Sequence, residues 1–514
     1  MLNQDDSPPT AGRSPSNGPS RSTFRRVIRW FCVSVIVATL GVVAAVLIWV
    51  WHWERQIGGD NTDTRMQASE IVSEAQGSFA DEANRWSELA DILATYEQLQ
   101  SEFQRNYPAP KDSAGFALPN WVPDASMAYD PSSSPEQSKA GAEFLARLDR
   151  SGLLARQEFF ERAKHFERPI DAPRLIDATF LDLTVARRLA RADRALLFRL
   201  WKSGGAQDKE AARVFEWLLA LGRAYRYQFG AINSLTGIAI QVLALDTIRE
   251  VCMNRPLRED ALALCLAAME RQLDAPERDF ALRCERILVL DTVQWSFSDD
   301  GRGDGYFLAA ENFDLGALTG NQARKTATGE GFFLASKKEL VDKFDELFGA
   351  DIEKSLRLPR DRTAAAWNDP VEGLPRRFRI LKILYPAPQK LIAAQDQLMG
   401  EVIGTKTLLA IELFRLRNNR LPGALSELVP GILAELPLDP YASGTLRYKQ
   451  TDPSEDPCGR DYLLYTVGSD RTDNDAKMNV KVPFTPLIGA PSGKGFDFVF
   501  NTPDPDLQKC LNAD

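Results

Sequence analysis

The chain has 514 residues, of which 44% are hydrophobic and 26% charged, so its composition excludes wholesale disorder. Its net charge of −9 argues against nucleic-acid binding, because neutralising phosphates requires a basic surface. Two histidines, His52 and His165, are too few for most zinc sites and most histidine catalysis. The length suggests two to four domains of about 150 residues each.

The strongest feature is an uncharged run of 22 residues from Trp30 to Trp51. A helix of this length spans a hydrocarbon core of about 30 Å, and tryptophans at both ends match the aromatic belts of membrane proteins. We predict a transmembrane helix over residues 30–53. One alternative is a buried core helix, which rarely runs this long without a charge. The other is a cleaved signal peptide, whose apolar region has about 7–15 residues and is followed by small residues.

The charges before this segment set its orientation. Residues 1–29 contain five arginines and two aspartates, a net charge of +3, and read as a disordered cytoplasmic tail. By the positive-inside rule, the chain crosses the cytoplasmic membrane once, with its N-terminus in the cytoplasm and its bulk extracytoplasmic, in the periplasm. With −9 for the whole chain and +3 before the span, the rest carries −12.

Two segments connect the span to the main body. Apolar residues recur every three or four positions from Ser69 to Arg105, which predicts one long helix within a juxtamembrane region, residues 54–106. This helix is either a stalk or packs back on the main domain. Residues 107–136 contain six prolines with serines between them and read as a linker or an extended wrapping segment.

Residues 137–385 have an almost continuous helical pattern and no 34-residue repeat, which predicts an irregular α-helical bundle or short solenoid. Residues 299–335 are rich in glycine and predict a loop. The expected helices are 137–167, 173–203, 207–229, 231–254, 257–272, 276–297 and 336–348.

The pattern changes in residues 386–514. A helix is expected at 388–419, followed by strands at 445–449, 462–467 and 496–500 that are separated by clusters of turn residues. The fold class is therefore mainly α, ending in an α+β module with a small antiparallel sheet.

This last segment resembles the globular domain of type II secretion major pseudopilins. The similarity rests on the ordered set LLAIELFRLRNNRLP (408–422), ALSELVP (424–430), ELPLDPY (435–441) and DYLLYTVGSDRTDND (461–475). The whole layout is also similar to a group of planctomycete membrane proteins with a signal anchor, a helical middle and a pseudopilin-like tail. In these, the middle carries segments like GIAIQVLALDTIREV and RCERILVLDTVQ.

The pseudopilin resemblance implies a calcium site in the loop after the second strand. Its matching carboxylates are Asp470, Asp473 and Asp475, joined by Asn474 and backbone carbonyls such as that of Val467. Calcium takes six to eight oxygen ligands, which such a loop supplies. The alternative is a solvated acidic turn.

Other acidic or glycine-rich segments fit known motifs poorly. The spacing of residues 300–311 matches an EF-hand loop, but Arg302 stands where an oxygen ligand is needed. Residues 489–495 resemble a phosphate-binding loop but lack the required spacing and the Ser or Thr after Lys494. Glu158, Glu161 and Glu167 near His165 read as a solvated helix face.

Five of the six cysteines follow the span, where disulfides persist. Cys458 and Cys510 are the two in the tail, and a bridge between them would pin the C-terminus to the sheet. The alternative is two separate thiols in loops. Cys252, Cys265 and Cys284 occupy apolar helix positions and are expected to pack as buried thiols.

These observations predict a membrane-anchored binding or scaffold protein of the bacterial envelope. Its predicted partners are the lipid bilayer, through residues 30–53, and an envelope protein. No catalytic residue is predicted, and calcium is the single cofactor considered. The alternatives are an envelope hydrolase with paired carboxylates in the helical domain, and an accessory part of a type II secretion or pilus-like system.

Overall fold

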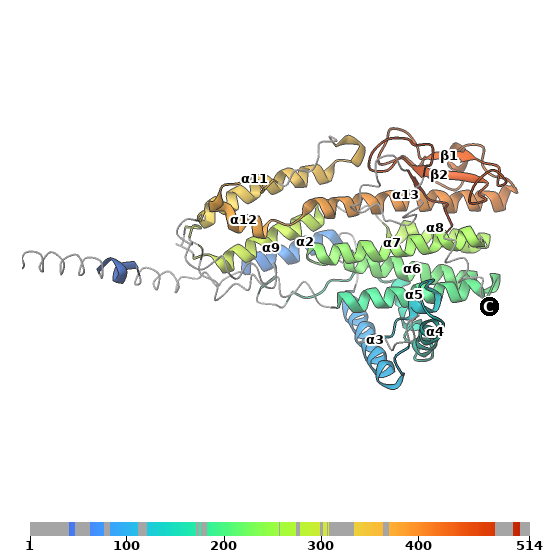
Figure 1. Ribbon diagram of the computed structural model, residues 1–514, viewed down its shortest axis with the longest axis horizontal. Helices are drawn as coiled ribbons and strands as arrows, with labels where there is room; N and C mark the ends of the chain where they lie inside the picture. Colours follow the sequence, from blue (N-terminus) through green and yellow to red (C-terminus); the bar gives the residue numbers. More distant parts are fainter. Residues whose placement is uncertain are drawn as a thin grey trace, which may run out of the picture.

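The computed structural model describes residues 41–46, 62–76, 83–110, 121–170, 174–175, 182–255, 257–273, 278–298, 302–305, 307, 334–362, 370–477 and 497–503. These residues are mainly helical, as predicted, and the helices form an elongated bundle (Figure 1). The helices are α2 (Thr62–Gln76), α3 (Trp86–Asn106), α4 (Pro135–Arg150), α5 (Leu183–Lys202), α6 (Asp208–Arg226), α7 (Ala231–Asn254), α8 (Glu259–Gln272), α9 (Phe280–Ser296), α11 (Lys337–Leu356), α12 (Arg379–Leu384) and α13 (Pro388–Asn418).

Two of these helices begin at a reciprocal capping arrangement. The Ser134 hydroxyl accepts a hydrogen bond from the N–H of Gln137, whose side chain accepts one from the N–H of Ser134. Ser336 and Glu339 repeat this arrangement at the start of α11. Each pair satisfies N–H groups that the first helical turn leaves without partners.

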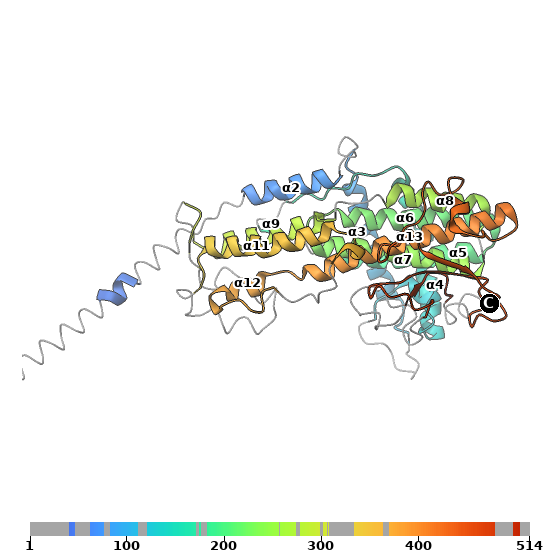
Figure 2. The same cartoon turned by 90° about the horizontal axis from the view of Figure 1, so that it is seen from above.

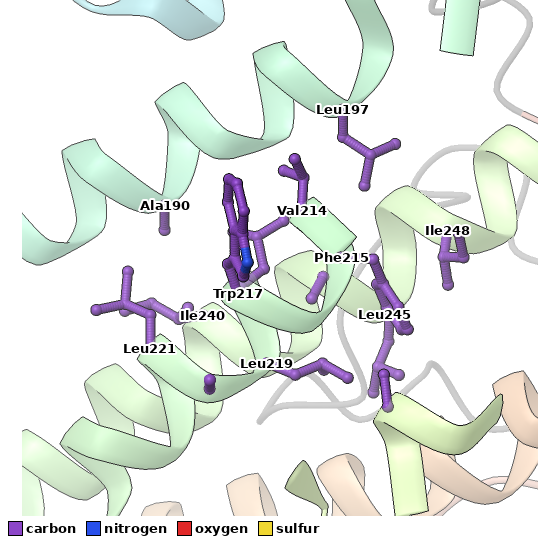
Figure 3. Close-up of a cluster of buried hydrophobic side chains, with 14 of the residues drawn as sticks. Ala190, Leu197, Val214, Phe215, Trp217, Leu219, Leu221, Ile240, Leu245 and Ile248 are labelled. Atoms are coloured by element: carbon purple, nitrogen blue, oxygen red, sulfur yellow. The ribbon is translucent and has the colours of Figure 1, made fainter. Parts of the chain in front are cut away.

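The centre of the bundle is the packing of α5, α6 and α7. Figure 3 shows apolar side chains of all three helices meeting, with Trp217 of α6 among them. Gly222 of α6 and Gly237 of α7 let the two backbones approach closely. A Cβ on Gly237 would lie 2.4 Å from the carbonyl oxygen of Gly222, which no ordinary side chain tolerates. Glycine is therefore a packing requirement at this crossing.

Helix α7 is the single helix among the described residues that is long and apolar enough to cross a membrane. Its most apolar window is 67% buried inside the protein, so α7 is a core helix. The predicted anchor, residues 30–53, lies outside the described residues except for 41–46. Those six residues are helical and exposed.

The region predicted as one helix from Ser69 to Arg105 contains two helices, so that expectation is wrong. Residues 83–85 between α2 and α3 are not helical. There Asn84 accepts hydrogen bonds from the N–H groups of Trp86 and Glu167, which draws the chain toward a distant loop. Helix α2 packs along α9, where Thr64 donates to Asp291 at 2.8 Å.

Two other expected helices are shorter than predicted. Helix α4 ends at Arg150, before Gly152, which adopts a left-handed backbone with φ of 74°. A 3-10 helix follows at Ala155–Glu161, and residues 163–170 are not helical. Helix α5 begins after Asp182, whose φ of 64° interrupts a helix at that point.

The predicted long helix followed by a small antiparallel sheet is confirmed. The strands are β1 (Arg447–Gln450), β2 (Tyr462–Thr466) and β3 (Phe498–Val499), in the order β1-β2-β3. Tyr465 is opposite Arg447 on one side and Val499 on the other. The sheet covers part of α13, and the Tyr462 hydroxyl donates to Glu412 at 2.9 Å.

Helix α13 belongs to the helical body as much as to the tail. It packs along α7 and α8, and Figures 1 and 2 show it running beside them for much of its length. Its buried residues Leu408, Leu409 and Leu413 lie in one continuous apolar cluster with the cores of α5, α6 and α7. The described residues after 386 therefore share their core with the helical body.

Candidate functional site

Charged side chains are enclosed where α7 and α13 meet. Arg249 of α7 contacts Glu401 of α13, with 2.5 Å between Nη1 and Oε2, and both side chains are almost fully buried. The same guanidinium donates to the Thr405 hydroxyl at 2.6 Å. Asp246, one turn earlier on α7, also pairs with Arg249, and its side chain is 52% exposed. One arginine thus joins a buried and a solvent-accessible carboxylate.

The C-terminal tail, through β3 and Phe500, closes this site from the other side. The Arg249 guanidinium carbon lies 5.8 Å from the ring centre of Phe498 and 5.9 Å from that of Phe500. A cation at this distance from an aromatic ring is attracted to it, more strongly when water is excluded. Strand β3 and the residue after it therefore form one wall around the buried charges.

A second ion cluster lies one and a half turns earlier on α13. Asp396 accepts hydrogen bonds from Arg278, which precedes α9, and from Arg362, whose Nη2 is 3.0 Å from Oδ1. Arg471 of the tail donates to the backbone carbonyl of Arg362 at 2.7 Å. Three segments that are distant in sequence are thus tied to one point of α13.

Tyr441 lies near both clusters and is buried. Burial, followed by the negative charges of Asp396, Glu401 and Asp439, holds the pKa of its phenol well above the ordinary value. Asp439 is fully buried and accepts hydrogen bonds from the Thr466 hydroxyl and the Tyr441 N–H, each at 2.8 Å. We call this set, Asp246, Arg249, Asp396, Glu401, Arg278, Arg362, Asp439 and Tyr441, the ionic junction.

The contacts of the ionic junction indicate a structural role, in which ion pairs hold neighbouring segments together. Burial raises the pKa values of Glu401 and Asp396, and the adjacent arginines oppose this by favouring the charged carboxylates. Glycoside hydrolysis requires two carboxyl groups that both reach the sugar. Glu401 and Asp396 are enclosed and ion-paired, so their contacts favour the joining of helices.

In the acidic turn after β2, the three predicted calcium ligands make hydrogen bonds to different partners. Asp473 accepts from Arg447 Nε at 3.0 Å and from the Tyr465 hydroxyl at 3.2 Å. Asp470 accepts from the N–H of Thr472, and Asp475 donates its own N–H to Asp473. No cluster of three or more His, Cys, Asp or Glu side chains that could hold a metal occurs in the described residues. The calcium site stays a prediction.

Asp497 is a carboxylate that contacts this turn and that the sequence did not indicate. Its oxygens accept hydrogen bonds from the N–H groups of Asn474 and Ala476 at 3.0 and 2.8 Å. It follows the turn by more than twenty positions, so no local spacing indicated the contact. Asp497 holds the acidic turn against the start of β3.

The prediction for the three cysteines of the helical domain is confirmed, whereas the one for the two tail cysteines is not tested. Cys252, Cys265 and Cys284 are buried free thiols, as expected, and burial raises the pKa of Cys284 to about 12. Such thiols are unreactive at neutral pH. Cys458 is exposed and is a free thiol among the described residues. Its predicted partner, Cys510, lies outside them, so the Cys458–Cys510 bridge stays a prediction.

Two weaker motifs have structural roles where the structure describes them. Asp304, from the EF-hand-like segment, accepts from the N–H groups of Gly305 and Lys338 at 2.8 and 3.0 Å and fixes the start of α11. His165 was expected on a helix face, but it lies in a non-helical segment, 3.4 Å from Glu167. The segment at 489–495 lies outside the described residues.

Comparison with known proteins adds no assignment: no family model matches the chain, and no curated protein or solved structure is significantly similar to it.

Proposed function

We propose that the chain is a single-pass membrane protein whose extracytoplasmic α-helical domain is a binding or scaffold module. The observation that carries this proposal is the uncharged 22-residue run after an N-terminal segment of net charge +3. Residues 41–46 in that run are helical, with Val42 64% exposed and Val43 48% exposed. Apolar side chains on an uncovered helix suit contact with lipid.

The ionic junction supports a scaffold role for the domain. Its buried carboxylates Glu401 and Asp396 are paired with arginines from other segments, so their charges join helices instead of facing a substrate. The tail, which resembles a pseudopilin domain, would then stabilise the domain through α13. A partner in the envelope would bind the outer surface of this rigid body.

Reporter fusions test the topology. Alkaline phosphatase, which is active outside the cytoplasm, is fused after residue 20 or after residue 514, and a cytoplasmic fluorescent reporter is placed at the same positions. We expect phosphatase activity at 514 and fluorescence at 20. Deletion of residues 30–51 is the control and should move the 514 fusion into the cytoplasm. Cytoplasmic activity at 514 in the intact chain would contradict the proposal.

Partner binding needs a separate test. The tagged full chain is crosslinked and purified from its native envelope, beside a control chain that ends at residue 61. We expect at least one envelope protein to be retained by the full chain and not by the control. Equal recovery from both chains would contradict a binding role for the domain.

A further inference from the structure

We propose that residues 373–395, the basic segment, face the membrane and bind anionic phospholipid headgroups on its extracytoplasmic surface. This inference rests on the proposed membrane anchor. It names a second contact with the bilayer, made by the folded domain, and it fixes which end of the domain is turned toward the membrane.

The basic segment is positively charged within an acidic chain. It contains five cationic residues and no carboxylate, whereas the whole chain has a net charge of −9. The cations are Arg376, Arg377, Arg379, Lys382 and Lys390. All of these except the half-buried Arg379 are exposed.

The fold fixes these cations on the outside of a rigid element. The segment includes a 3-10 helix, Arg376–Phe378, followed directly by α12. Phe378, Ile380 and Leu381 between the cations are buried in the core around α9 and α11. The apolar side chains hold the segment in place, so binding through its positive charges does not require the backbone to be ordered first.

A series of hydrogen bonds connects the basic segment to the place where the chain arrives from the anchor. Thr64, near the start of α2, donates to Asp291 of α9 at 2.8 Å. One turn later on α9, Gln294 accepts from Lys337 at 2.6 Å, and nearby Ala335 donates its N–H to the Arg377 carbonyl at 2.9 Å. In Figures 1 and 2, α2 and α12 lie in the half of the molecule nearest residues 41–46, and the strands lie in the other half.

The length of the tether limits how far this end can be from the lipid. The predicted span ends at residue 53 and α2 begins at Thr62, which leaves residues 54–61 between them. Eight residues reach at most about 29 Å when fully extended. The half of the domain that contains the basic segment is therefore kept close to the membrane surface.

Electrostatics then select the orientation. The chain after residue 29 carries −12, so an anionic membrane repels this part of the chain as a whole. Arg377 pairs with Glu339 at 3.0 Å, and Glu372 precedes the segment, so two carboxylates offset part of its charge. Five cations against these two leave the basic segment itself with a net positive charge. Attraction of basic residues to anionic lipid acts within a Debye length, about 8–10 Å at moderate salt.

Two glycines offer matched positions for a fluorescent probe. A Cβ at Gly373, at the start of the basic segment, or at Gly431, in the tail, would have no atom within 4 Å, and both residues are exposed. The full chain carries Gly373→Cys or Gly431→Cys in a background with Cys32→Ser, Cys458→Ser and Cys510→Ser. The thiols at 252, 265 and 284 are buried and do not compete for the probe.

The labelled chain is reconstituted in vesicles of phosphatidylcholine, with or without phosphatidylglycerol, that contain a headgroup-attached quencher. We expect phosphatidylglycerol to increase quenching at 373 about twofold and to leave 431 unchanged, because the attraction is short-ranged. Salt of about 1 M, where the Debye length is about 3 Å, should remove the increase. Equal quenching at both positions, or an increase that resists salt, would overturn the proposal.

Charge reversal identifies the residues responsible. Arg376→Glu with Lys382→Glu should abolish the effect of phosphatidylglycerol at 373. The control is Lys209→Glu with Lys449→Glu, which changes the net charge equally on exposed residues outside the basic segment and should keep the effect. An unchanged response in the first variant would overturn the proposal.

The anchor is checked in the same preparations. Extraction of the unaltered chain from the vesicles by alkaline carbonate would refute the anchor, and the basic-segment proposal with it. Retention of the chain without a response to phosphatidylglycerol would refute the basic-segment proposal alone.

Discussion

Gly404 of α13 faces the ring of Phe500 so closely that a Cβ on Gly404 would lie 2.1 Å from Cε1 of that ring. This contact fixes the residue after β3 against α13, one turn from Glu401. The same ring lies beside the Arg249 guanidinium. The glycine thus decides whether the tail can close over the ionic junction.

We expect Gly404→Ala to lower the free energy of unfolding by about 1–3 kcal/mol, since a methyl group here overpacks the contact with Phe500. The control is Gly349→Ala in α11, where a Cβ would have no atom within 4 Å. That change should raise stability by about 0.5–1 kcal/mol through helix propensity. Chemical denaturation of both variants measures the difference, and a stabilised Gly404→Ala would refute the packing described.

Glu401 tests the ionic junction. Removing one partner of a buried ion pair leaves a buried charge and typically costs about 3–5 kcal/mol. We expect Glu401→Ala to cost less than this, because Asp246 also pairs with Arg249. Glu346→Ala, which breaks an exposed pair with Lys343, should cost under about 1 kcal/mol. Equal losses in the two variants, measured by denaturation, would contradict the structural role of the junction.

Asp193 should make stability depend on pH. It is fully buried in α5, and its Oδ1 accepts from Gln157 Nε2 at 2.6 Å. Asp193 Oδ2 and Gln157 Oε1 have no hydrogen-bond partner among the described residues. Burial raises the pKa of Asp193 to about 8, opposed by the hydrogen bond from Gln157. An unfolded aspartate has a pKa of about 3.9.

Between these two pKa values the folded state holds a proton that the unfolded state releases. The stabilisation is complete below about pH 4 and is lost as the pH rises through about 8, by up to about 1.4 kcal/mol per unit. Denaturation across this range should show the slope in the unaltered chain, and Asp193→Asn should make it shallower, because the raised pKa values of Glu401 and Asp396 contribute the remainder. Asp342→Asn, at an exposed position, is the control and should keep the slope. A slope as steep in Asp193→Asn as in the unaltered chain would rule out Asp193 as a source.

The calcium prediction can be sharpened by one contact. Arg447 occupies one oxygen of Asp473, so an ion bound there must displace this arginine. If the turn binds calcium, millimolar calcium should raise the melting temperature by mass action. Asp473→Ala should abolish the rise and Arg447→Ala should enlarge it. Asp452→Ala in another acidic turn is the control. A melting curve that is the same with calcium and with a chelator would show that this acidic turn does not bind calcium.

Local patterns predicted much of the fold. The apolar run of α7 is followed closely by Pro256, and its predicted bounds match the observed helix, Ala231–Asn254. The division between α2 and α3 was missed because the apolar spacing continues on both sides of it. The interruption depends on the pairing of Asn84 with Glu167, 83 positions away, which no local pattern contains.

The ionic junction was beyond prediction for the same reason. Arg249 and Thr405 are 156 positions apart, and an arginine within a helical pattern reads as exposed. Asp396 and Glu401 likewise appear as ordinary polar positions of a long helix. Their burial becomes evident when α13 is seen packed on α7 and covered by the tail.

The packing of α13 also bears on how the chain is made. Helices α7 and α8 leave the ribosome well before α13, and they have no cover for one apolar side until residues 388–418 arrive. A polypeptide that stops early, or is cut before this point, keeps that side exposed to proteases and chaperones. The helical body therefore reaches its packed state only after α13 has been synthesised, because α13 covers the apolar side of α7 and α8.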